Sequence, residues 1–399
     1  MAQRNVNNEA TKPMEFGITE EQQAIQETAR RFAQEKIAPD FQKREETGVI
    51  ERSLVKEMAA LGLVASDLPE DFGGLGIDGV TAGLIIEEIA YADLNVSYIQ
   101  LLNSLIGRII VDHARPELAQ AWVPKMVAGE ALMSLGLTEP RGGSDAAHLQ
   151  LKAERSGNTE YVLNGEKTSI SMADQTDAIV LFARTNQEEE GARGVSAFLV
   201  PLDAPGISCS RFSDLGSEAV GRGSVFFDSV RVPAENMLGD EGEGFRQVMQ
   251  GFDYSRALIG LMCLGAARAS LDETWAFITE REAFGLPLAQ FQGVTFPLAE
   301  AETAYKAARH ICFETLWRRD AGLPHTSEAA MAKWFAPKSS VDIIHQCLLS
   351  HGHSGYSRDL PHQQRLRDVI GLEIGDGTAQ IMKLIVAREK VGRAAVQYG

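Results

Sequence analysis

The stretch RDVIGLEIGDGTAQI, from Arg367 to Ile381, decides how the rest of this 399-residue chain is understood. It places one carboxylate, Asp376, between two glycines, and a helical pattern follows at residues 381–395. Because glycine lets the backbone approach a ligand closely, Asp376 is a candidate proton-transfer group held over a bound molecule. The alternative is structural: Asp376 or Thr378 caps the first turn of the helix. The stretch alone leaves both interpretations open.

The sequence around this stretch, from residue 244 to the end, is dominated by helical periodicity. Apolar residues recur at helical spacing in four long segments, which predict helices at residues 245–280, 291–321, 327–350 and 378–397. Long amphipathic helices with short connections are typical of a four-helix bundle. Asp376 would lie directly before the last helix of that bundle.

The middle of the chain has a β-rich pattern. Apolar runs at residues 179–183, 195–200 and 225–232 predict strands, and Asn164-Gly165 predicts a tight hairpin turn. The loop that opens this part, LTEPRGGSD at residues 137–145, combines glycines, hydroxyls and one arginine. Such a loop can donate hydrogen bonds to an anionic or heteroaromatic ligand.

The first third of the chain is predicted to be helical. Thr19 to Gln22 has the capping-box pattern, and further helices are predicted at residues 51–61, 80–92, 95–113 and 116–127. Within it, GLGIDG at residues 74–79 fits the dinucleotide-binding pattern GxGxxG. It follows the acidic segment DLPEDF and no strand, so we interpret it as a glycine-rich turn.

The predicted fold is therefore mostly α with a central β-domain. Its parts are a disordered tail at residues 1–14, an N-terminal helical domain at 15–130, a middle β-barrel-like domain at 131–243 and a C-terminal four-helix bundle at 244–399.

Composition restricts the function further. A net charge of −17 argues against a nucleic-acid surface, and no apolar run approaches the roughly 20 residues of a membrane span. The polar N-terminus lacks the apolar core of a signal peptide. Four widely spaced cysteines are typical of reduced residues in a cytoplasmic protein. His351 and His353 have no acidic or cysteine partner at metal-binding spacing, so no metal site is expected.

The order of these parts, and the motifs in them, resemble the acyl-CoA dehydrogenase family from Glu15 onward. LPEDFGG at 68–74 is similar to the family's first loop, and LTEP at 137–140 with GSD at 143–145 is similar to its flavin-binding segment. NGEKTSIS at 164–171 resembles the hairpin that packs on the isoalloxazine ring, and FDYSR at 252–256 resembles the start of the family's helical bundle. GDGT at 375–378 stands where most members carry Glu-Gly-Thr.

This resemblance implies FAD-dependent α,β-dehydrogenation of an acyl-CoA thioester. Asp376 would remove the α-proton while the β-hydrogen leaves as hydride to flavin N5. A flavin ribityl hydroxyl and the backbone N–H of Asp376 would polarise the thioester carbonyl. The reduced FAD would pass its electrons to an electron-transfer flavoprotein, and the enzyme would be a homotetramer.

The resemblance also implies which residues form the site. The residues that would contact FAD are Leu135, Leu137, Thr138, Ser144, Ser169, Ser171, Arg281, Phe284, Gln292, Gly377, Thr378 and Gln380. Of these, Arg281, Phe284 and Gln292 would reach the FAD of a neighbouring subunit. The residues that would contact the substrate are Ser144, Asp253, Ser255, Arg256, Gly375 and Arg388. For Arg388 a salt bridge on its own helix face is an equal alternative.

Three departures from the family pattern concern the acyl group. Asp376 is one C–C bond, about 1.5 Å, shorter than the usual glutamate. Gly375 stands where many members carry tyrosine, and Ser169 where many carry tryptophan. Together they predict a short, wide pocket that suits a ring, and members acting on cyclohexanecarboxyl-CoA resemble this chain in having the aspartate. We therefore expect oxidation of cyclohexane-1-carboxyl-CoA to cyclohex-1-ene-1-carboxyl-CoA, a step in alicyclic acid degradation.

Other interpretations stay open on the sequence. A short branched-chain acyl-CoA is the main alternative substrate. A nitroalkane-oxidising flavoprotein would also use an aspartate base, although FDYSR favours a CoA thioester, and a non-catalytic flavin-binding scaffold is a third alternative. Leu349 and His353 replace a glutamine and a glycine that usually help to hold FAD, so neither residue is assigned to the cofactor.

Overall fold

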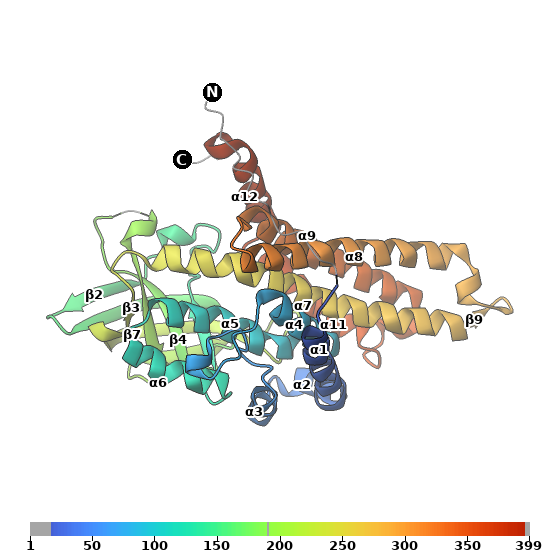
Figure 1. The fold of residues 1–399 in the computed structure, drawn as a ribbon, viewed down its shortest axis with the longest axis horizontal. Coiled ribbons are helices and arrows are strands. Elements are labelled where there is room, and N and C mark those ends of the chain that lie inside the picture. Colours follow the sequence, from blue (N-terminus) through green and yellow to red (C-terminus); the bar gives the residue numbers. More distant parts are fainter. Residues whose placement is uncertain (1–16, 190, 396–399) are drawn as a thin grey trace.

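The computed structural model describes residues 17–189 and 191–395, so the predicted tail at residues 1–14 lies outside the described residues. Three parts follow one another along the chain: helices, a β-sheet, and long helices that extend from the sheet toward the opposite end of the molecule (Figure 1). The predicted fold class, mostly α with a central β-domain, is confirmed.

The N-terminal part is helical. Its helices are α1 (Glu20–Phe32), which continues into a π-helical turn (Ala33–Ile37), α2 (Phe41–Thr47), α3 (Arg52–Ala60), α4 (Gly79–Ala92), α5 (Leu94–His113) and α6 (Pro116–Val127). The capping box is confirmed, because the Thr19 hydroxyl accepts a hydrogen bond from Gln22 N at 3.1 Å and the Gln22 side chain accepts one from Thr19 N at 3.0 Å.

The GxGxxG segment is a turn, as predicted. A short 3₁₀ turn (Glu70–Phe72) precedes it, and Asp78 caps α4 by accepting a hydrogen bond from Thr81 N at 2.7 Å. No strand precedes the glycines among the described residues, so the βαβ setting that a dinucleotide site needs is missing there.

Helix α5 requires a correction to the composition argument. It is the one helix among the described residues that is long and apolar enough to cross a membrane, judged by length and hydropathy alone. However, 89% of its most apolar 18-residue window is buried inside the protein. The apolar run therefore forms the packing surface of a core helix, lying between the sheet and the long C-terminal helices.

The middle part is an eight-stranded, largely antiparallel sheet. Its strands are β1 (Met133–Gly136), β2 (Lys152–Ser156), β3 (Glu160–Ser171), β4 (Ala178–Arg184), β5 (Val195–Pro201), β6 (Ile207–Arg211), β7 (Arg222–Pro233) and β8 (Met237–Leu238). They are paired in the order β6-β7-β3-β2-β4-β5-β8, with β1 parallel to β4.

Strand β4 shows how the sheet joins the helices. Val180 and Phe182 belong to the core shared with the helical parts, whereas Ile179 and Leu181 belong to the sheet's own core. Because alternate side chains of a strand point to opposite faces, β4 is buried on both. One face of the sheet therefore packs against the helices.

The predicted hairpin turn at Asn164-Gly165 is wrong. Strand β3 runs straight through these residues, and its pairing with β7 shifts register there, as at a β-bulge. Gly165 has φ +142°, which glycine accommodates easily, and the Asn164 side chain accepts a hydrogen bond from Ser229 N on β7. The turn lies earlier, at residues 157–159 between β2 and β3.

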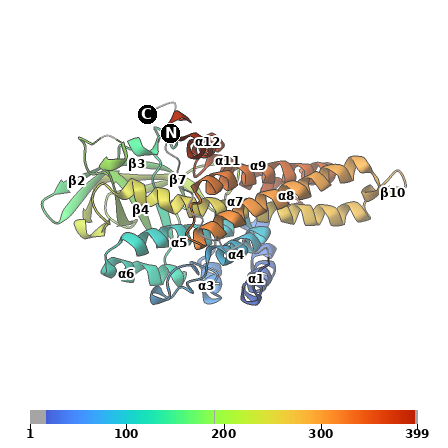
Figure 2. The same ribbon diagram turned by 45° about the horizontal axis from the view of Figure 1, so that its top comes forward.

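The C-terminal part contains α7 (Gly244–Glu280), a short hairpin of β9 (Glu282–Ala283) and β10 (Leu286–Pro287), α8 (Gln292–Asp320), α9 (Thr326–Ser350), α10 (His353–Tyr356), α11 (His362–Ile374) and α12 (Ala379–Val391). Figure 2 shows the sheet at one end of the long helices and the β9–β10 hairpin at the other.

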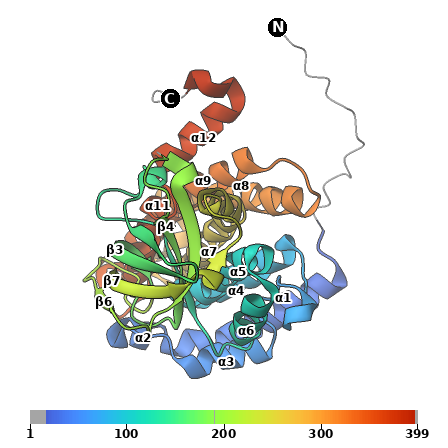
Figure 3. The same cartoon turned by 90° about the vertical axis from the view of Figure 1, so that its left-hand side faces the viewer.

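The prediction for the fourth bundle helix needs correction. Helix α11, which was not predicted, packs along α7 and α9, whereas α12 contacts α9 and projects away from the remainder of the chain (Figure 3). The apolar stripe of α11 is weak because its buried face includes Arg365 and Asp368. Its charged residues concealed it from a search for apolar periodicity.

A buried polar network joins all three parts and positions α11. Asp368 Oδ2 accepts a hydrogen bond from Asn95 Nδ2 at 3.0 Å, and Asp368 Oδ1 accepts one from Ser217 N at 2.6 Å. On the N-terminal side, Arg44 Nε donates to Asp93 Oδ2 at 2.7 Å. Burial raises the pKa of Asp368 to about 7. Helix α11, and with it the loop that carries Asp376, is thus held against both other parts.

Candidate active site

Asp376 lies in the four-residue loop between α11 and α12. The chain is extended at Gly375, then left-handed at Asp376, with φ +54°, and at Gly377, with φ +98°. Aspartate is one of the few residues with a side chain that tolerates the left-handed region. The glycines and the aspartate therefore build a sharp reversal that presents the Asp376 side chain at the surface of the loop.

The capping role belongs to Thr378. Its hydroxyl accepts a hydrogen bond from Ile381 N at 3.3 Å, which satisfies an N–H of the first turn of α12. The Asp376 carboxylate has no hydrogen-bond partner among the described residues. Its backbone N–H is equally unpaired there. Both groups are available to a bound molecule.

The electrostatic surroundings of Asp376 are mixed. Desolvation by the surrounding protein raises the pKa of its carboxyl group, although the residue itself is exposed in the single chain. The charges of Lys333 and Arg256 act in the opposite direction and lower that pKa. The carboxylate is therefore a base with increased proton affinity, because the effect of desolvation on its pKa exceeds that of the neighbouring cations.

Arg256 is held firmly beside this carboxylate. It is buried, and its Nη1 donates to Asp253 Oδ1 at 2.7 Å one helical turn earlier in α7. Asp253 Oδ2 in turn accepts a hydrogen bond from Thr326 Oγ1 at 2.6 Å. Arg388 on α12 is exposed, and its charge acts on Arg256. The structure thus brings together Asp376, Arg256, Asp253 and Arg388.

Two residues near Asp376 were missed from the sequence. Lys333 on α9 is buried, and Tyr98 on α5 is buried close enough to Asp376 for the carboxylate to raise the pKa of its phenol, after the larger effect of burial. A single lysine in the apolar run AAMAKWFA was a detectable signal. The tyrosine gave none, because it resembles any other apolar residue of α5.

The loop at residues 137–145 is anchored by a buried ion pair. Lys167 Nζ donates to Glu139 Oε1 at 2.8 Å and to the Leu137 carbonyl at 3.0 Å. Glu139 also accepts hydrogen bonds from two backbone N–H groups, those of residues 150 and 151. Burial lowers the pKa of Lys167 to about 8, and the neighbouring Glu139 opposes that shift.

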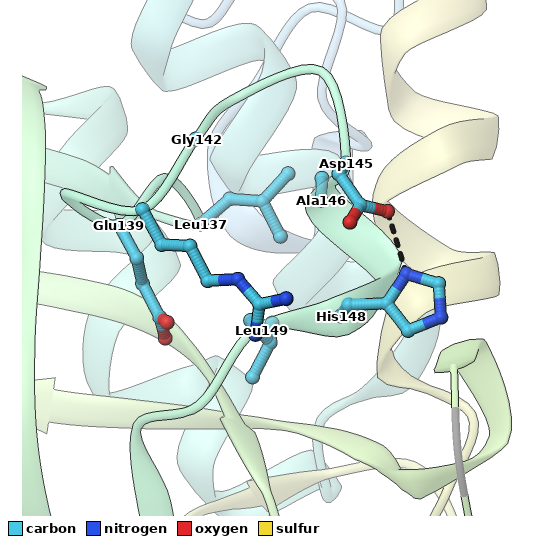
Figure 4. A pocket seen from close by; sticks show the side chains of 8 residues that line it. Leu137, Glu139, Gly142, Asp145, Ala146, His148 and Leu149 are labelled. Carbon is cyan, nitrogen blue, oxygen red and sulfur yellow. Dashed lines mark hydrogen bonds and ion pairs between the residues drawn. The ribbon is translucent and has the colours of Figure 1, made fainter.

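This loop encloses a small pocket (Figure 4). Leu137, Glu139 and His148 are among the residues that line it, and His148 Nδ1 lies 2.5 Å from Asp145 Oδ1 at one side. Gly142 has nothing within 4 Å of where a Cβ would be. The loop thus leaves open space beside its backbone.

The residues predicted to contact FAD in this part offer unused hydroxyls. The side chains of four of them make no hydrogen bond to any described residue: Thr138, Ser144, Ser169 and Ser171. Ser169 also has a left-handed backbone, with φ +58°, inside β3. Free hydroxyls beside a glycine-rich loop fit a heteroaromatic ring bearing phosphates, and so these residues fit FAD.

Other predicted residues lie elsewhere. Leu135 is half-buried in β1, Gln380 is exposed in the first turn of α12, and Ser255 is buried with its hydroxyl donating to the Phe252 carbonyl at 3.4 Å. Arg281, Phe284 and Gln292 lie around the β9–β10 hairpin, at the end of the long helices away from the sheet. One chain does not bring this last group to Asp376.

The expected absence of a metal site remains a prediction, and the described residues contain no cluster of three or more histidine, cysteine or acidic side chains. His351 stacks on Phe277, with ring centroids 4.2 Å apart, and its Nδ1 contacts the Cys347 carbonyl. All four cysteines are free; Cys263, Cys312 and Cys347 are buried, whereas Cys209 on β6 is exposed.

Comparison with known proteins identifies this arrangement. The three domain profiles of one family match in sequence order: acyl-CoA dehydrogenase N-terminal domain at residues 19–130, middle domain at 134–230 and C-terminal domain at 242–391. A probable acyl-CoA dehydrogenase, YngJ, of Bacillus subtilis is 36% identical over 94% of this chain and 99% of its own length. The chain belongs to the acyl-CoA dehydrogenase family.

Further relatives support the same assignment for this acyl-CoA dehydrogenase. The mitochondrial short-chain specific acyl-CoA dehydrogenase of Rattus norvegicus is 34% identical over 93% of this chain and 90% of its own length. A glutaryl-CoA dehydrogenase of Mycobacterium smegmatis, solved in complex with FADH2, superposes with a TM-score of 0.90 at 25% identity, covering 95% and 97% of the two chains. A chain from the structure of the electron transferring flavoprotein of Acidaminococcus fermentans superposes with a TM-score of 0.92 at 30% identity, covering 95% and 100%.

Membership establishes the general chemistry. The protein is an FAD-dependent oxidoreductase that acts on a CH–CH bond of an acyl-CoA.

Proposed function

We propose that this acyl-CoA dehydrogenase oxidises cyclohexane-1-carboxyl-CoA to cyclohex-1-ene-1-carboxyl-CoA, with Asp376 as the base that removes the α-proton. The observation that carries the proposal is an unpaired aspartate in a left-handed turn between two glycines. Aspartate is shorter than glutamate, and its glycine neighbours leave space beside it. Such a base suits a ring substrate that places its α-carbon close to the carboxylate.

The residues of this chain have distinct tasks in the proposed reaction. Asp376 accepts the α-proton, and its free backbone N–H donates to the thioester oxygen as negative charge develops there. When bound, FAD would supply the acceptor for the hydride that leaves the β-carbon. Arg256, which its ion pair with Asp253 holds in place, puts a positive charge beside the base. The hydroxyls of Thr138 and Ser171 would hold the flavin ring.

The raised proton affinity of Asp376 is part of the proposal. The α-proton of a thioester is weakly acidic, so a carboxylate with an ordinary pKa is a poor match for it. Desolvation raises the pKa of Asp376, and the closing of a substrate over it would exclude water further. A carboxylate with a raised pKa is the stronger base, so it accepts the α-proton more readily than a carboxylate with an ordinary pKa would.

The proposal extends to partners. An electron-transfer flavoprotein would reoxidise the enzyme, in line with the close superposition on the Acidaminococcus fermentans structure. A homotetramer would give the β9–β10 hairpin a neighbour's FAD to contact, which suits Phe284, exposed to 97% in the single chain. Flavin reoxidation by an added electron-transfer flavoprotein tests the proposed electron acceptor. Sedimentation of the purified protein tests the homotetramer. The cytoplasm is the proposed location.

The experiment is anaerobic mixing of the purified FAD enzyme with a panel of acyl-CoAs while the flavin absorbance is recorded. Rapid bleaching by cyclohexanecarboxyl-CoA, and slow bleaching by butyryl-CoA and isobutyryl-CoA, is the expected outcome. The reverse order would refute the ring substrate. Asp376→Asn should bind the thioester and leave the flavin oxidised, and wild-type bleaching by that variant would refute the role of the base.

A short-chain acyl-CoA is the second candidate. The short-chain specific enzyme of Rattus norvegicus is 34% identical over 93% of this chain, which favours a small acyl group. The same panel separates the two candidates, since butyryl-CoA and isobutyryl-CoA are included in it.

A further inference from the structure

Lys333 is a buried lysine that bonds to no carboxylate among the described residues. It lies on α9, only 1% of its surface is accessible, and its Nζ donates to two backbone carbonyls: Leu372 O at 2.7 Å and Gly377 O at 3.3 Å. Burying an ammonium group is costly unless its donors are satisfied. Most other lysines among the described residues are exposed to solvent, whereas Lys333 is buried.

The two carbonyls that Lys333 contacts lie on either side of Asp376. Leu372 belongs to the last turn of α11, where carbonyls lose their partners within the helix. Gly375 N closes that turn on Gly371 O at 2.9 Å, and the chain then becomes extended. No backbone N–H among the described residues reaches Leu372 O, so the lysine takes the place of a C-terminal cap.

The second contact fixes the other side of the reversal. Gly377 has φ +98° and follows the left-handed Asp376. By donating to Gly377 O, the same ammonium group ties the end of α11 to the start of α12. A positive charge at the C-terminus of a helix is also favourable for the helix dipole.

The charge of Lys333 acts on the base as well. It lowers the pKa of the Asp376 carboxyl, against the larger effect of desolvation. The other groups facing this carboxylate are Arg256 on α7 and Tyr98 on α5. Lys333 itself also faces Cys263 on α7 and Glu373 on α11.

We propose that Lys333 is a positioning residue for the dehydrogenation: it clamps the two backbone carbonyls that flank Asp376 and so holds the loop that presents the carboxylate. Its action is indirect, because it contacts the loop and leaves the carboxylate oxygens free for the substrate. The inference rests on the proposed role of Asp376 as the base.

Three substitutions separate the clamp from the charge. Lys333→Met removes both, Lys333→Gln keeps an N–H donor and removes the charge, and Lys333→Arg keeps the charge. Lys338→Met is the matched control, because Lys338 lies on the same helix, is exposed, and pairs with Asp342 on that helix. All variants are prepared as FAD holoenzymes.

The first readout is the titration of Asp376 itself, followed by NMR of aspartate labelled with ¹³C at the carboxyl carbon and assigned by its loss in Asp376→Asn. Removing the lysine charge takes away a stabiliser of the ionised carboxylate. Lys333→Met and Lys333→Gln should therefore move the titration to higher pH, whereas Lys333→Arg and Lys338→Met should leave it close to that of the wild type.

The second readout is the pH dependence of flavin reduction by substrate. In Lys333→Met the rate profile should shift to higher pH, and kcat at neutral pH should fall by about tenfold or more, because the base is both misplaced and partly protonated. KM should change much less. A structural loss of stability alone would not displace the titration of Asp376.

Each outcome bears on a different statement. A wild-type kcat in Lys333→Met, which removes both the donor and the charge, overturns the positioning role. A wild-type titration and pH profile in Lys333→Gln, which keeps a donor, overturns the effect of the charge. If the NMR shift occurs while Asp376→Asn still reduces the flavin at the wild-type rate, the effect of Lys333 on Asp376 stands and the proposed base falls.

Discussion

Lengthening the base tests the geometric argument most directly. Asp376→Glu adds one C–C bond, about 1.5 Å, to a side chain whose backbone is fixed by a left-handed reversal and two flanking glycines. Reacting atoms in a productive complex lie about 3–3.5 Å apart, and a misplacement of about 1 Å can cost about 100-fold in rate. The longer carboxylate would therefore occupy space that the proposed ring substrate needs.

The expected result is a reversal of substrate preference. The limiting rate of flavin reduction by cyclohexanecarboxyl-CoA should fall by about 100-fold, or about 2.7 kcal/mol of activation free energy. The rate with butyryl-CoA should fall less or rise, because an unbranched chain can retreat from the longer base. Glutamate also tolerates the left-handed backbone less well than aspartate, which adds a penalty of about 1 kcal/mol to folding.

Anaerobic stopped-flow absorbance measures both rates on the same preparation. Asp342→Glu is a suitable control, because it makes the same lengthening at an exposed position of α9. If Asp376→Glu leaves the ratio of the two rates unchanged, the length of the base does not select the substrate, and the pocket argument is wrong.

Three further predictions concern stability and are checked by chemical or thermal denaturation. Arg44→Met should destabilise the protein by about 3–5 kcal/mol, because it leaves the buried Asp93 carboxylate unpaired. Burial and a neighbouring histidine lower the pKa of His362 to about 4, so the unfolded chain binds more protons below its ordinary value of about 6.5. Stability should therefore fall as the pH drops from 6.5 to 4, by about 3 kcal/mol in total, and His362→Gln should flatten that dependence; an equally steep curve would contradict it. Gly265→Ala should lower the free energy of unfolding by about 1–3 kcal/mol, because its Cβ would lie 2.5 Å from a backbone carbonyl of α4. Gly371→Ala, whose Cβ would have nothing within 4 Å, should be neutral or stabilising. Equal effects of the two substitutions would refute the packing argument.

Much of the fold follows from local sequence signals. The capping box at Thr19, the periodic runs of α4 to α9 and the β-rich middle segment each reflect physics that acts within a few residues. Asp376 could be singled out in the same way, since two flanking glycines and a following helix are local features.

Errors arose where tertiary contacts override a local preference. Asn164-Gly165 has the composition of a turn, but pairing with β7 keeps it inside β3 as a bulge. Helix α11 buries Arg365 and Asp368 because distant partners satisfy them, Glu273 on α7 for the first and Asn95 on α5 for the second. No window of sequence contains those partners.

The sequence by itself determined the family, the three-part organisation and the identity of the candidate base. Only the tertiary structure decided that Thr378 caps α12 while Asp376 stays unpaired, since capping depends on backbone geometry. Only the structure showed Lys333 beneath that loop, 43 residues before Asp376 along the chain. The reason is physical: a hydrogen bond or a charge acts over a few ångströms, and the fold decides which distant residues come that close.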